Sequence, residues 1–300
     1  MGFKKKLLAL SMIGITCVSF LAGCGKSDNP KKVGMVLSTL NNPFFVSMKE
    51  GAEKEAEKLG FELIILDSTN DPAKERANVE DLIELDVVAL LINPTDSDAI
   101  VKTVEVANEA NIPVITLDRQ SNGGVVTSHI ASDNIVGGEM AAEYALEMLK
   151  DKKEINVVEL QGIPGASATR DRGKGFHNVL DKMENVKFIS SQSADFDRQK
   201  GLSVMENIIQ GNPNFDVVFA HNDEMALGAS KAIKTAGINA LVIGFDGNDD
   251  AIEAIDKKDL SATVAQQPNE IGALGVKLAQ DLYEGKTVDS IQAAELKMYN

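Results

Sequence analysis

Residues 33–60 read VGMVLSTLNNPFFVSMKEGAEKEAEKLG, and this stretch indicates the class of fold. It opens with a short apolar run, Val33–Leu37, of the kind found in strands that are buried on both faces. Phe45–Leu59 then places apolar residues three and four positions apart, which predicts an amphipathic helix, and Gly60 can cap its C-terminus. A buried strand that leads into a helix predicts a parallel sheet covered by helices.

The same alternation recurs along the rest of the chain. Further apolar, β-branched runs occur at Leu63–Leu66, Val87–Ile92, Val114–Leu117, Val157–Leu160, Val217–Ala220 and Leu241–Phe245. Helical spacing covers Ile135–Leu149, Met225–Ala236 and Ile271–Tyr283. About four strand–helix units fill residues 33–132 and a comparable set fills 155–266, so we predict an α/β fold of two doubly wound parallel-sheet lobes.

The composition excludes several classes of protein. The chain has 300 residues, of which 44% are hydrophobic and 25% charged, as in a globular protein. Its net charge of −15 argues against a general nucleic-acid binder, because contact with phosphates needs clustered cations. Cysteine occurs only at positions 17 and 24, so a disulfide scaffold and a zinc site with several thiolate ligands are both excluded.

The first 23 residues have the layout of a signal peptide. Lys4–Lys6 precede the uncharged stretch Leu7–Gly23, which is short for a membrane-spanning helix, the alternative interpretation. Leu21–Cys24 (LAGC) resembles the lipobox of bacterial lipoproteins, which implies cleavage before Cys24 and acylation of that residue. Residues 24–32 would then form a lipidated tether, and we expect the mature protein outside the cytoplasm, anchored to the cell membrane.

Polar side chains follow the predicted strands, at the edge where parallel strands end. These residues are Ser38, Asn42, Asn93, Asp118, Arg119, Asn222 and Asp246, and Phe44, Phe45 and Phe245 stand among them. Open parallel sheets bind ligands outside the carboxyl ends of their strands, so we expect these side chains to converge. Amides, ions and flat apolar rings suit a sugar, whose hydroxyls take paired hydrogen bonds while its C–H face packs on aromatic side chains.

Most of these residues also have a purely structural explanation. Good helix N-caps are Ser38, Asn42, Asp118 and Asn222. Asp246-Gly247 can form a tight turn, Phe44 or Phe45 can belong to the core, and Arg172 can be a solvated charge on a helix. Capping does not explain Arg119 beside an aspartate at a strand end, nor two adjacent phenylalanines after a proline. Together the residues therefore favour a ligand site.

From about Val33 to its end, the sequence resembles the periplasmic ribose-binding proteins that feed sugar ABC transporters. The matching segments are Ser38–Phe45 (STLNNPFF), Asn93–Asp98 (NPTDSD), Thr116–Gln120 (TLDRQ), Gln161–Gly173, Ala194–Arg198 (ADFDR), Asn222–Gly228 (NDEMALG), Gly244–Gly247 (GFDG) and Ala265–Gln266. Because these segments are long and occur in the family's order, the resemblance is specific.

The resemblance implies a periplasmic binding protein type I fold, in which a three-segment hinge joins the two lobes. The N-terminal lobe would comprise residues 33–132 and 267–294, and the C-terminal lobe residues 133–266 and 295–300. The crossings would lie near Ser132-Asp133, near Gln266-Gln267 and at about residue 294, and the lobes would close on the ligand.

The resemblance also implies the ligand and the partners. D-ribose would lie between the lobes, with its ring between Phe44 and Phe45 on one side and Phe196 on the other, and with Phe245 nearby. Its hydroxyl partners would be Ser38, Asn42, Asn93, Asp118, Arg119, Arg172, Asn222, Asp246 and Gln266. A permease and an ATPase would be the partners of a monomeric binding protein that needs no cofactor and no metal.

The assignment of the binding arginine and the residue at position 221 each rest on a neighbouring position. Arg172 is chosen over Arg170 because the binding arginine of the family directly precedes the glycine that stands here at 173. His221 departs from the family, which carries glutamine there. It lies one step from Asn222 along a strand, so its side chain is expected to point away from the site.

Other functions were weighed against sugar binding. The sequence has no G-x-S-x-G, G-x-x-x-x-G-K-[ST] or H-E-x-x-H motif, and its histidines, at 129, 177 and 221, lack ligand spacing. Asp118 and Asp246 could form a glycosidase pair, but arginines beside them favour ionised carboxylates and thus binding. A transcriptional regulator would carry a helix-turn-helix where the leader lies. Allose, galactose or a furanosyl signal molecule remain alternative ligands.

Overall fold

The structure, a computed structural model, describes residues 30–300. The predicted signal peptide, the lipidation site at Cys24 and most of the predicted tether lie outside the described residues. The first strand begins at Lys31, so Lys31 and Lys32 pair within a sheet rather than belonging to the tether. Across residues 30–300, no helix is both long and apolar enough to cross a lipid bilayer.

The first sheet has six strands that all pair in parallel. They are β1 (Lys31–Leu37), β2 (Phe61–Asp67), β3 (Leu90–Ile92), β4 (Val114–Leu117), β5 (Ser128–Ser132) and β11 (Ile291–Ala294). Their order in space is β11-β5-β4-β3-β1-β2, so β1 lies inside the sheet and the chain winds outward from it in both directions.

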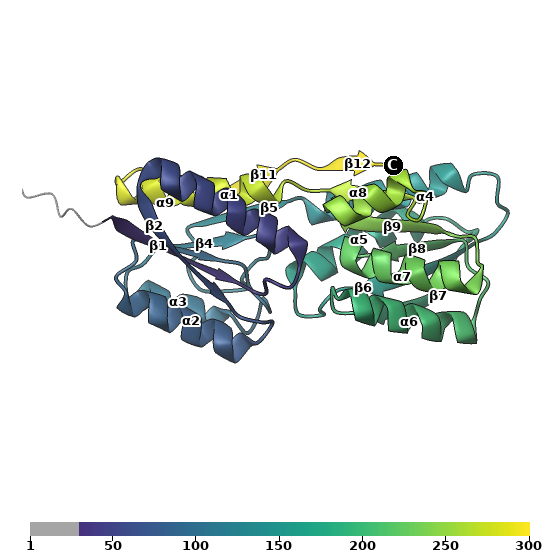
Figure 1. The fold of residues 1–300 in the computed structure, drawn as a ribbon, viewed down its shortest axis with the longest axis horizontal. Helices are drawn as coiled ribbons and strands as arrows, with labels where there is room; N and C mark the ends of the chain where they lie inside the picture. The colour runs from purple at the N-terminus through teal and green to yellow at the C-terminus, as the bar shows by residue number, and fades with distance from the viewer. Residues whose placement is uncertain (1–29) are drawn as a thin grey trace, which may run out of the picture. The chain divides into compact units, whose positions relative to one another are not determined.

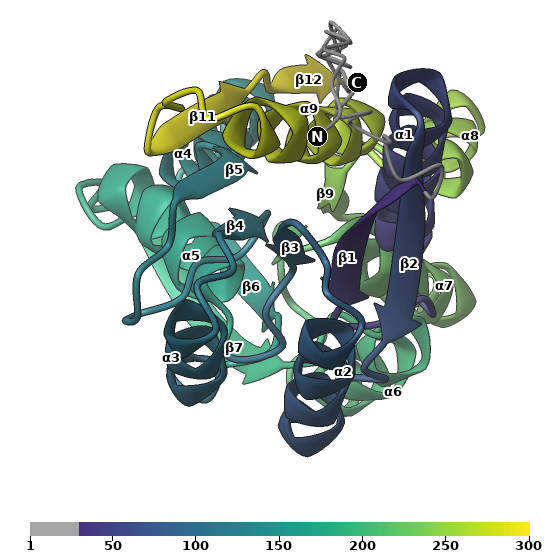
Figure 2. The same cartoon turned by 90° about the vertical axis from the view of Figure 1, so that its left-hand side faces the viewer.

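Helices cover both faces of this first sheet and together with it form the first lobe. They are α1 (Pro43–Leu59), α2 (Pro72–Glu84), α3 (Val101–Glu109) and α9 (Pro268–Tyr283). α1 packs against α9 on one face, and α2 packs against α3 on the other (Figure 2). Met35 and Leu37 of β1 enter the α1–α9 core, whereas Val36 enters the α2–α3 core. Burial on both faces is the reason that β1 is apolar throughout.

The second sheet also has six strands, five of them parallel. They are β6 (Ile155–Gln161), β7 (Val186–Ser193), β8 (Val217–Ala220), β9 (Leu241–Asp246), β10 (Ala262–Ala265) and β12 (Lys297–Tyr299). Their order is β12-β10-β9-β8-β6-β7, and β12 runs antiparallel to β10 (Figure 1).

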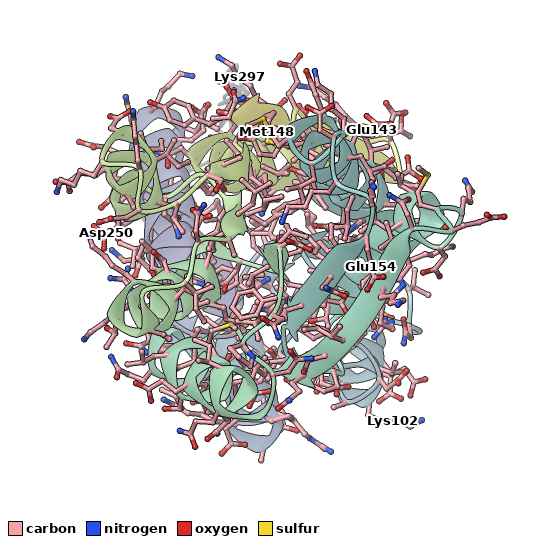
Figure 3. All side chains as sticks on the ribbon, turned by 90° about the vertical axis from the view of Figure 1, so that its right-hand side faces the viewer. Lys102, Glu143, Met148, Glu154, Asp250 and Lys297 are labelled. Carbon is pink, nitrogen blue, oxygen red and sulfur yellow. The ribbon has the colours of Figure 1, made fainter. Side chains whose placement is uncertain are left out.

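The helices of this second lobe likewise lie on both faces of their sheet. They are α4 (Asn134–Met148), α5 (Ser167–Leu180), α6 (Arg198–Gly211), α7 (Asp223–Ala236) and α8 (Asp249–Asp256). α4 and α5 share one core with the sheet, and α6, α7 and α8 share the other. Charged side chains such as Glu143 and Asp250 are exposed and point outward (Figure 3).

The predicted α/β fold with two parallel-sheet lobes is confirmed. The antiparallel strand β12 departs from a purely parallel second sheet. Strands β5, β7, β10, β11 and β12 were not among the apolar runs picked out in the sequence. The eight residues of β7 are all half-buried or exposed, so that this edge strand carries polar side chains and gives no apolar signal.

The chain passes between the two sheets three times. It passes after β5 of the first sheet, whose successor α4 packs on α5, and returns after β10, whose successor α9 packs on α1. The last passage lies between β11 and β12, which are separated by only residues 295 and 296.

The contact between α4 and α5 depends on glycine, because a Cβ atom at Gly175 would lie 2.0 Å from the carbonyl oxygen of Ile135. Gly175→Ala should push the two helices apart and lower the free energy of unfolding by about 1–3 kcal/mol, measured by urea denaturation. Gly211→Ala is the control, since no atom lies within 4 Å of the added Cβ, and it should be neutral or slightly stabilising. Equal effects of the two substitutions would contradict this account.

Candidate functional site

The predicted site residues come from both lobes, and several of them lie at the carboxyl ends of strands. All are buried: Ser38, Asn42, Phe44, Phe45, Asn93, Asp118, Arg119, Arg172, Phe196, Asn222, Phe245, Asp246 and Gln266. Ser38 directly follows β1 and Asp118 directly follows β4, whereas Asn222 comes two residues after β8 and Asp246 ends β9. The parallel strands of each sheet therefore bring these side chains to the same edge.

One cavity takes its walls from both lobes. Its lining residues are Asn42, Phe44, Phe45, Asp118 and Arg119 from the first lobe, and Ala168, Arg172, Phe196, Asn222 and Asp246 from the second. The cavity measures about 10 Å³. That volume holds about one water molecule, so the walls have to move apart before a larger molecule can enter. Ala168 was not predicted from the sequence, because a methyl group carries no chemical signal.

Ser38 and Asn93 stand behind this wall instead of in it. The hydroxyl of Ser38 donates to Asn93 Oδ1 at 2.6 Å. Asn93 Nδ2 donates to the carbonyl of Leu117 at 3.0 Å and to Asp118 Oδ2 at 3.3 Å. The two side chains thus orient the Asp118 carboxylate, and the sequence did not separate this supporting position from a lining one.

Arg172 is the charged group that connects the two lobes. Its Nη2 lies 3.9 Å from Asp118 Oδ1 of the first lobe, and its Nη1 lies 3.4 Å from Asp246 Oδ1 of the second. Its Nε donates to Asn134 Oδ1 at 2.8 Å, and Nη1 donates to the carbonyl of His221 at 2.6 Å. Arg170, the alternative that the sequence offered, is exposed.

Phe245 and Gln266 support the same charged groups from behind. The guanidinium carbon of Arg172 lies 3.8 Å from the centre of the Phe245 ring, a cation–π contact. On its other side the ring meets Gly137, where a Cβ atom would lie 2.5 Å from ring carbons. Gln266 Nε2 donates to Asp246 Oδ1 at 2.9 Å. Arg172 and Asp246 are therefore both held in place by the second lobe.

Arg119 supplies a second guanidinium to the cavity. It lies 5.2 Å from the ring centre of Phe45 and 5.1 Å from that of Phe196, one phenylalanine from each lobe. Its Nε and the Oδ1 atom of Asp118 are buried without a hydrogen-bond partner. Buried polar atoms are normally paired, so a free donor and a free acceptor at one cavity suit a ligand that bears hydroxyl groups.

Three cavity residues have a backbone conformation that favours glycine. The φ angles are 61° at Asp118, 60° at Phe196 and 124° at Asp246. For residues with side chains such angles cost on the order of 1–3 kcal/mol each, and they persist where the surrounding structure holds them. Three such residues at one cavity favour it as the candidate site, by a signal that sequence patterns do not reveal.

The structural explanations weighed for these residues apply to some of them. Asn42 Oδ1 accepts from the Phe44 amide and Asn222 Oδ1 from the Met225 amide, each at 3.0 Å, so both cap helices while also lining the cavity. Asp118 precedes no helix and contacts the arginines instead. Phe44 and Phe45 belong to the α1–α9 core as well as to the cavity wall.

Burial changes the electrostatics of the site. It raises the pKa of Asp246 well above the usual range, and the nearby Arg172 offsets only part of this rise. The expected effect of the arginines is therefore outweighed at Asp246 by the loss of hydration. An ionised carboxylate accepts hydrogen bonds from hydroxyls and a protonated one can also donate, so either form can bind a sugar.

His221 points away from the cavity, as predicted, although it directly follows β8 instead of lying within it. Its Nε2 lies 3.0 Å from Glu159 Oε1, and both side chains are fully buried. Its carbonyl oxygen nevertheless serves the site, because it accepts from Arg172. Over the described part of the chain, no group of three or more His, Cys, Asp or Glu side chains has the geometry to hold a metal ion.

The chain is similar to known sequences over most of its length. The family described as periplasmic binding protein domain matches residues 33–287. The chain belongs to this family. Among periplasmic binding proteins, the ribose import binding protein of Bacillus subtilis (strain 168) is 52% identical over 298 residues, which cover 97% of this chain and 96% of that protein. The ribose import binding protein of Escherichia coli (strain K12) is 48% identical, with 99% of each chain covered.

Solved structures of periplasmic binding proteins share the fold. The crystal structure of a galactofuranose binding protein superposes with a TM-score of 0.85 at 31% sequence identity. The match covers 90% of this chain and 94% of that one. Both lobes therefore belong to an architecture that is known to hold sugars.

The half-buried His177 lies next to Glu159, the carboxylate that also contacts His221. Its titration therefore tests the charge of Glu159. Glu159, whose carboxylate oxygen lies 3.6 Å from His177 Nε2, raises the pKa of that histidine from 6.5 to about 9. A histidine with a raised pKa in the folded state stabilises the protein fully below pH 6.5 and loses this effect as the pH rises through 9. Wild-type stability should therefore fall between these pH values more steeply than that of His177→Gln, measured by urea denaturation. Parallel pH profiles would disprove the coupling.

Proposed function

We propose that the protein captures D-ribose in the cavity between its lobes and delivers it to the permease of an ABC importer. The observation that carries the proposal is the contact of Arg172 with Asp118 of one lobe and Asp246 of the other. Identities of 52% and 48% to two ribose import binding proteins support the choice of sugar.

The chemistry of the cavity suits a small polyol. Asp118 Oδ1 can accept from a hydroxyl and Arg119 Nε can donate to one, since neither atom has a hydrogen-bond partner. Phe45 from one lobe and Phe196 from the other both lie near the Arg119 guanidinium, and their rings can pack against the C–H bonds of a sugar. Charged groups make stronger hydrogen bonds than neutral ones, so a few such contacts give both affinity and orientation.

Closure of the lobes contributes to affinity. Micromolar binding corresponds to about −8 kcal/mol. About ten heavy atoms of a pentose would each have to supply ~0.8 kcal/mol, which lies between the ceilings of ~1.5 for the best tiny ligands and ~0.3 for drug-sized ones. A cleft that contacts only one side of the sugar leaves half the hydroxyls in water. Backbone contacts between lobes accompany the closed arrangement: the Ser97 amide donates to the Gly165 carbonyl at 3.0 Å, and the Gln120 amide to Ser167 Oγ at 2.9 Å.

We infer that the protein binds its sugar without changing it. Two relatives, at 52% and 48% identity, are import binding proteins, which supports binding without turnover. Another sugar, such as allose, galactose or a furanosyl compound, is the alternative ligand, and the similarity to a galactofuranose binding protein keeps it open. Calorimetric titration with ribose, allose and galactose decides between them, and turnover of a glycoside would contradict the proposal.

Arg172→Ala should weaken ribose binding by at least about tenfold. The substitution removes a donor, leaves buried Asp246 without its cation and leaves Asp118 with only Arg119, which typically costs on the order of 2–5 kcal/mol. Lys174→Ala, which removes an exposed positive charge from the same helix, is the matched control and should leave the Kd unchanged. Isothermal titration calorimetry gives both values. Normal binding by Arg172→Ala would refute the assignment.

We further propose that residues 1–23 are a signal peptide and that Cys24 carries the lipid anchor. The protein would then act outside the cytoplasm as a monomer held at the cell membrane, beside the permease and ATPase subunits. Intact-mass measurement of the detergent-extracted protein should show an acylated chain that begins at Cys24, and Cys24→Ser should release the protein from the membrane. An unmodified N-terminus would exclude the anchor.

A further inference from the structure

Asp223 is a fully buried carboxylate that does not line the cavity. It is the first residue of α7 and lies directly behind the cavity residue Asn222. Its Oδ2 accepts from the backbone amides of Gly247 and Asn248, both at 2.8 Å. Its Oδ1 accepts from the hydroxyl of Thr263 at 2.7 Å. One side chain thus ties together α7, β10 and the turn that follows β9.

That turn carries the carboxylate Asp246 into the cavity. The φ angles of Asp246 and Gly247 are 124° and 78°, so two successive residues have left-handed conformations. At Gly247 a side chain is also excluded by contact, because a Cβ atom would lie 2.5 Å from the Cβ of Ala265. A non-glycine residue in such a conformation has to be held by its surroundings. The two amides that end on Asp223 supply that restraint immediately after Asp246.

The Asp223 carboxylate is also tightly packed against the sheet. At Gly244 of β9, a Cβ atom would lie 2.2 Å from Asp223 Oδ1, so the carboxylate occupies the space that a side chain would need. The central strand β9 therefore fixes its position from below, while the amides of Gly247 and Asn248 contact its other oxygen. The Asp223 carboxylate therefore lies between Gly244 of β9 and the amides of the turn that follows this strand.

Keeping a carboxylate at this place is energetically unfavourable. Burial raises the pKa of Asp223 to about 7, although hydrogen bonds from Thr263, Asn248 and Gly247 act to lower it. It also lies close enough to Asp246 that each acid raises the cost of ionising the other. A buried acid with no contact to the cavity needs a structural purpose, and its hydrogen bonds to the turn provide one.

We propose that Asp223 is a positioning residue, which holds the turn Asp246–Asn248 so that Asp246 presents its carboxylate to the sugar. This inference rests on the proposed function, because it gives Asp246 the role of a sugar ligand. Asp223 acts through the backbone and does not itself contact the ligand.

Two substitutions at Asp223 separate its geometry from its charge. Asp223→Asn keeps an oxygen that accepts from Gly247 and Asn248 and places an amide where Thr263 Oγ1 can accept, so it should bind ribose within about threefold of the wild type. Asp223→Ala removes every acceptor and should weaken binding about tenfold or more, since the amides of Gly247 and Asn248 lose the partner that restrains the turn. Recovery of affinity in Asp223→Asn relative to Asp223→Ala identifies positioning.

Ile233→Ala is the control for a general loss of stability. Ile233 is buried near the other end of α7, and this substitution should destabilise the lobe while leaving the Kd unchanged. If Asp223→Ala does not fold, Asn248→Pro serves instead: the φ of Asn248 is −65°, which proline can adopt, and proline removes the amide hydrogen that Asp223 accepts and places its Cδ atom against the carboxylate. It too should weaken binding. Unchanged binding in Asp223→Ala, or in Asn248→Pro, overturns the proposal, as does an Asp223→Asn variant as weak as Asp223→Ala.

Amide hydrogen exchange without sugar keeps the two proposals distinguishable. The amides of Gly247 and Asn248 should exchange slowly in the wild type and in Asp223→Asn, but at least about tenfold faster in Asp223→Ala. Loss of ribose binding by the wild type would refute the proposed function while leaving this exchange pattern intact. Unaltered exchange in Asp223→Ala would refute the positioning role even if ribose binds.

Discussion

A buried guanidinium needs anionic partners, and Arg172 takes its partners from both lobes. Asp118 comes from the end of β4 and Asp246 from the end of β9, so the charge balance of the cavity is complete only when the two lobes meet. Removing these ions from water is costly, and their mutual attraction alone does not always offset that cost. In the proposed function, a polyol that hydrogen bonds to each of them would compensate for lost hydration, and closure would then be coupled to binding.

The surrounding framework holds groups that would otherwise relax. Asp118, Phe196 and Asp246 all have positive φ angles, and each is restrained by a different neighbour. Asn93 donates to the Asp118 carboxylate, Asn222 Nδ2 donates to the Phe196 carbonyl, and the residues after Asp246 donate to Asp223. These hydrogen bonds fix the three conformations within each lobe, so that less order has to be created on binding.

Sequence patterns revealed the fold where burial is two-sided. Apolar runs such as Val33–Leu37 identify central parallel strands, because both faces of those strands are covered. Edge strands such as β7 and β11 are not covered on both faces and carry polar or exposed residues. They therefore give no apolar run and were not predicted. The direction of β12 depends on a distant pairing with β10, which no local pattern encodes.

The site was predictable to the extent that topology places strand ends together. The resemblance to ribose-binding proteins supplied Phe196, Arg172 and Gln266, which strand ends alone do not single out. Neither approach distinguished residues that line the cavity from those behind it, such as Ser38. Asn134 and Asp223 were missed because their hydrogen bonds join segments that are far apart in the chain. Nor do local patterns show which non-glycine residues adopt left-handed backbone conformations.

The final strands β11 and β12 lie side by side in the chain but complete different sheets. Neither lobe therefore corresponds to a continuous stretch of polypeptide. Each sheet lacks one of its edge strands until residues 291–299 are available. During synthesis the first lobe cannot finish folding as an independent unit ahead of the second. If the chain is exported, this dependence on its tail delays the completion of either half, which keeps the polypeptide in a state that a translocation channel can accept.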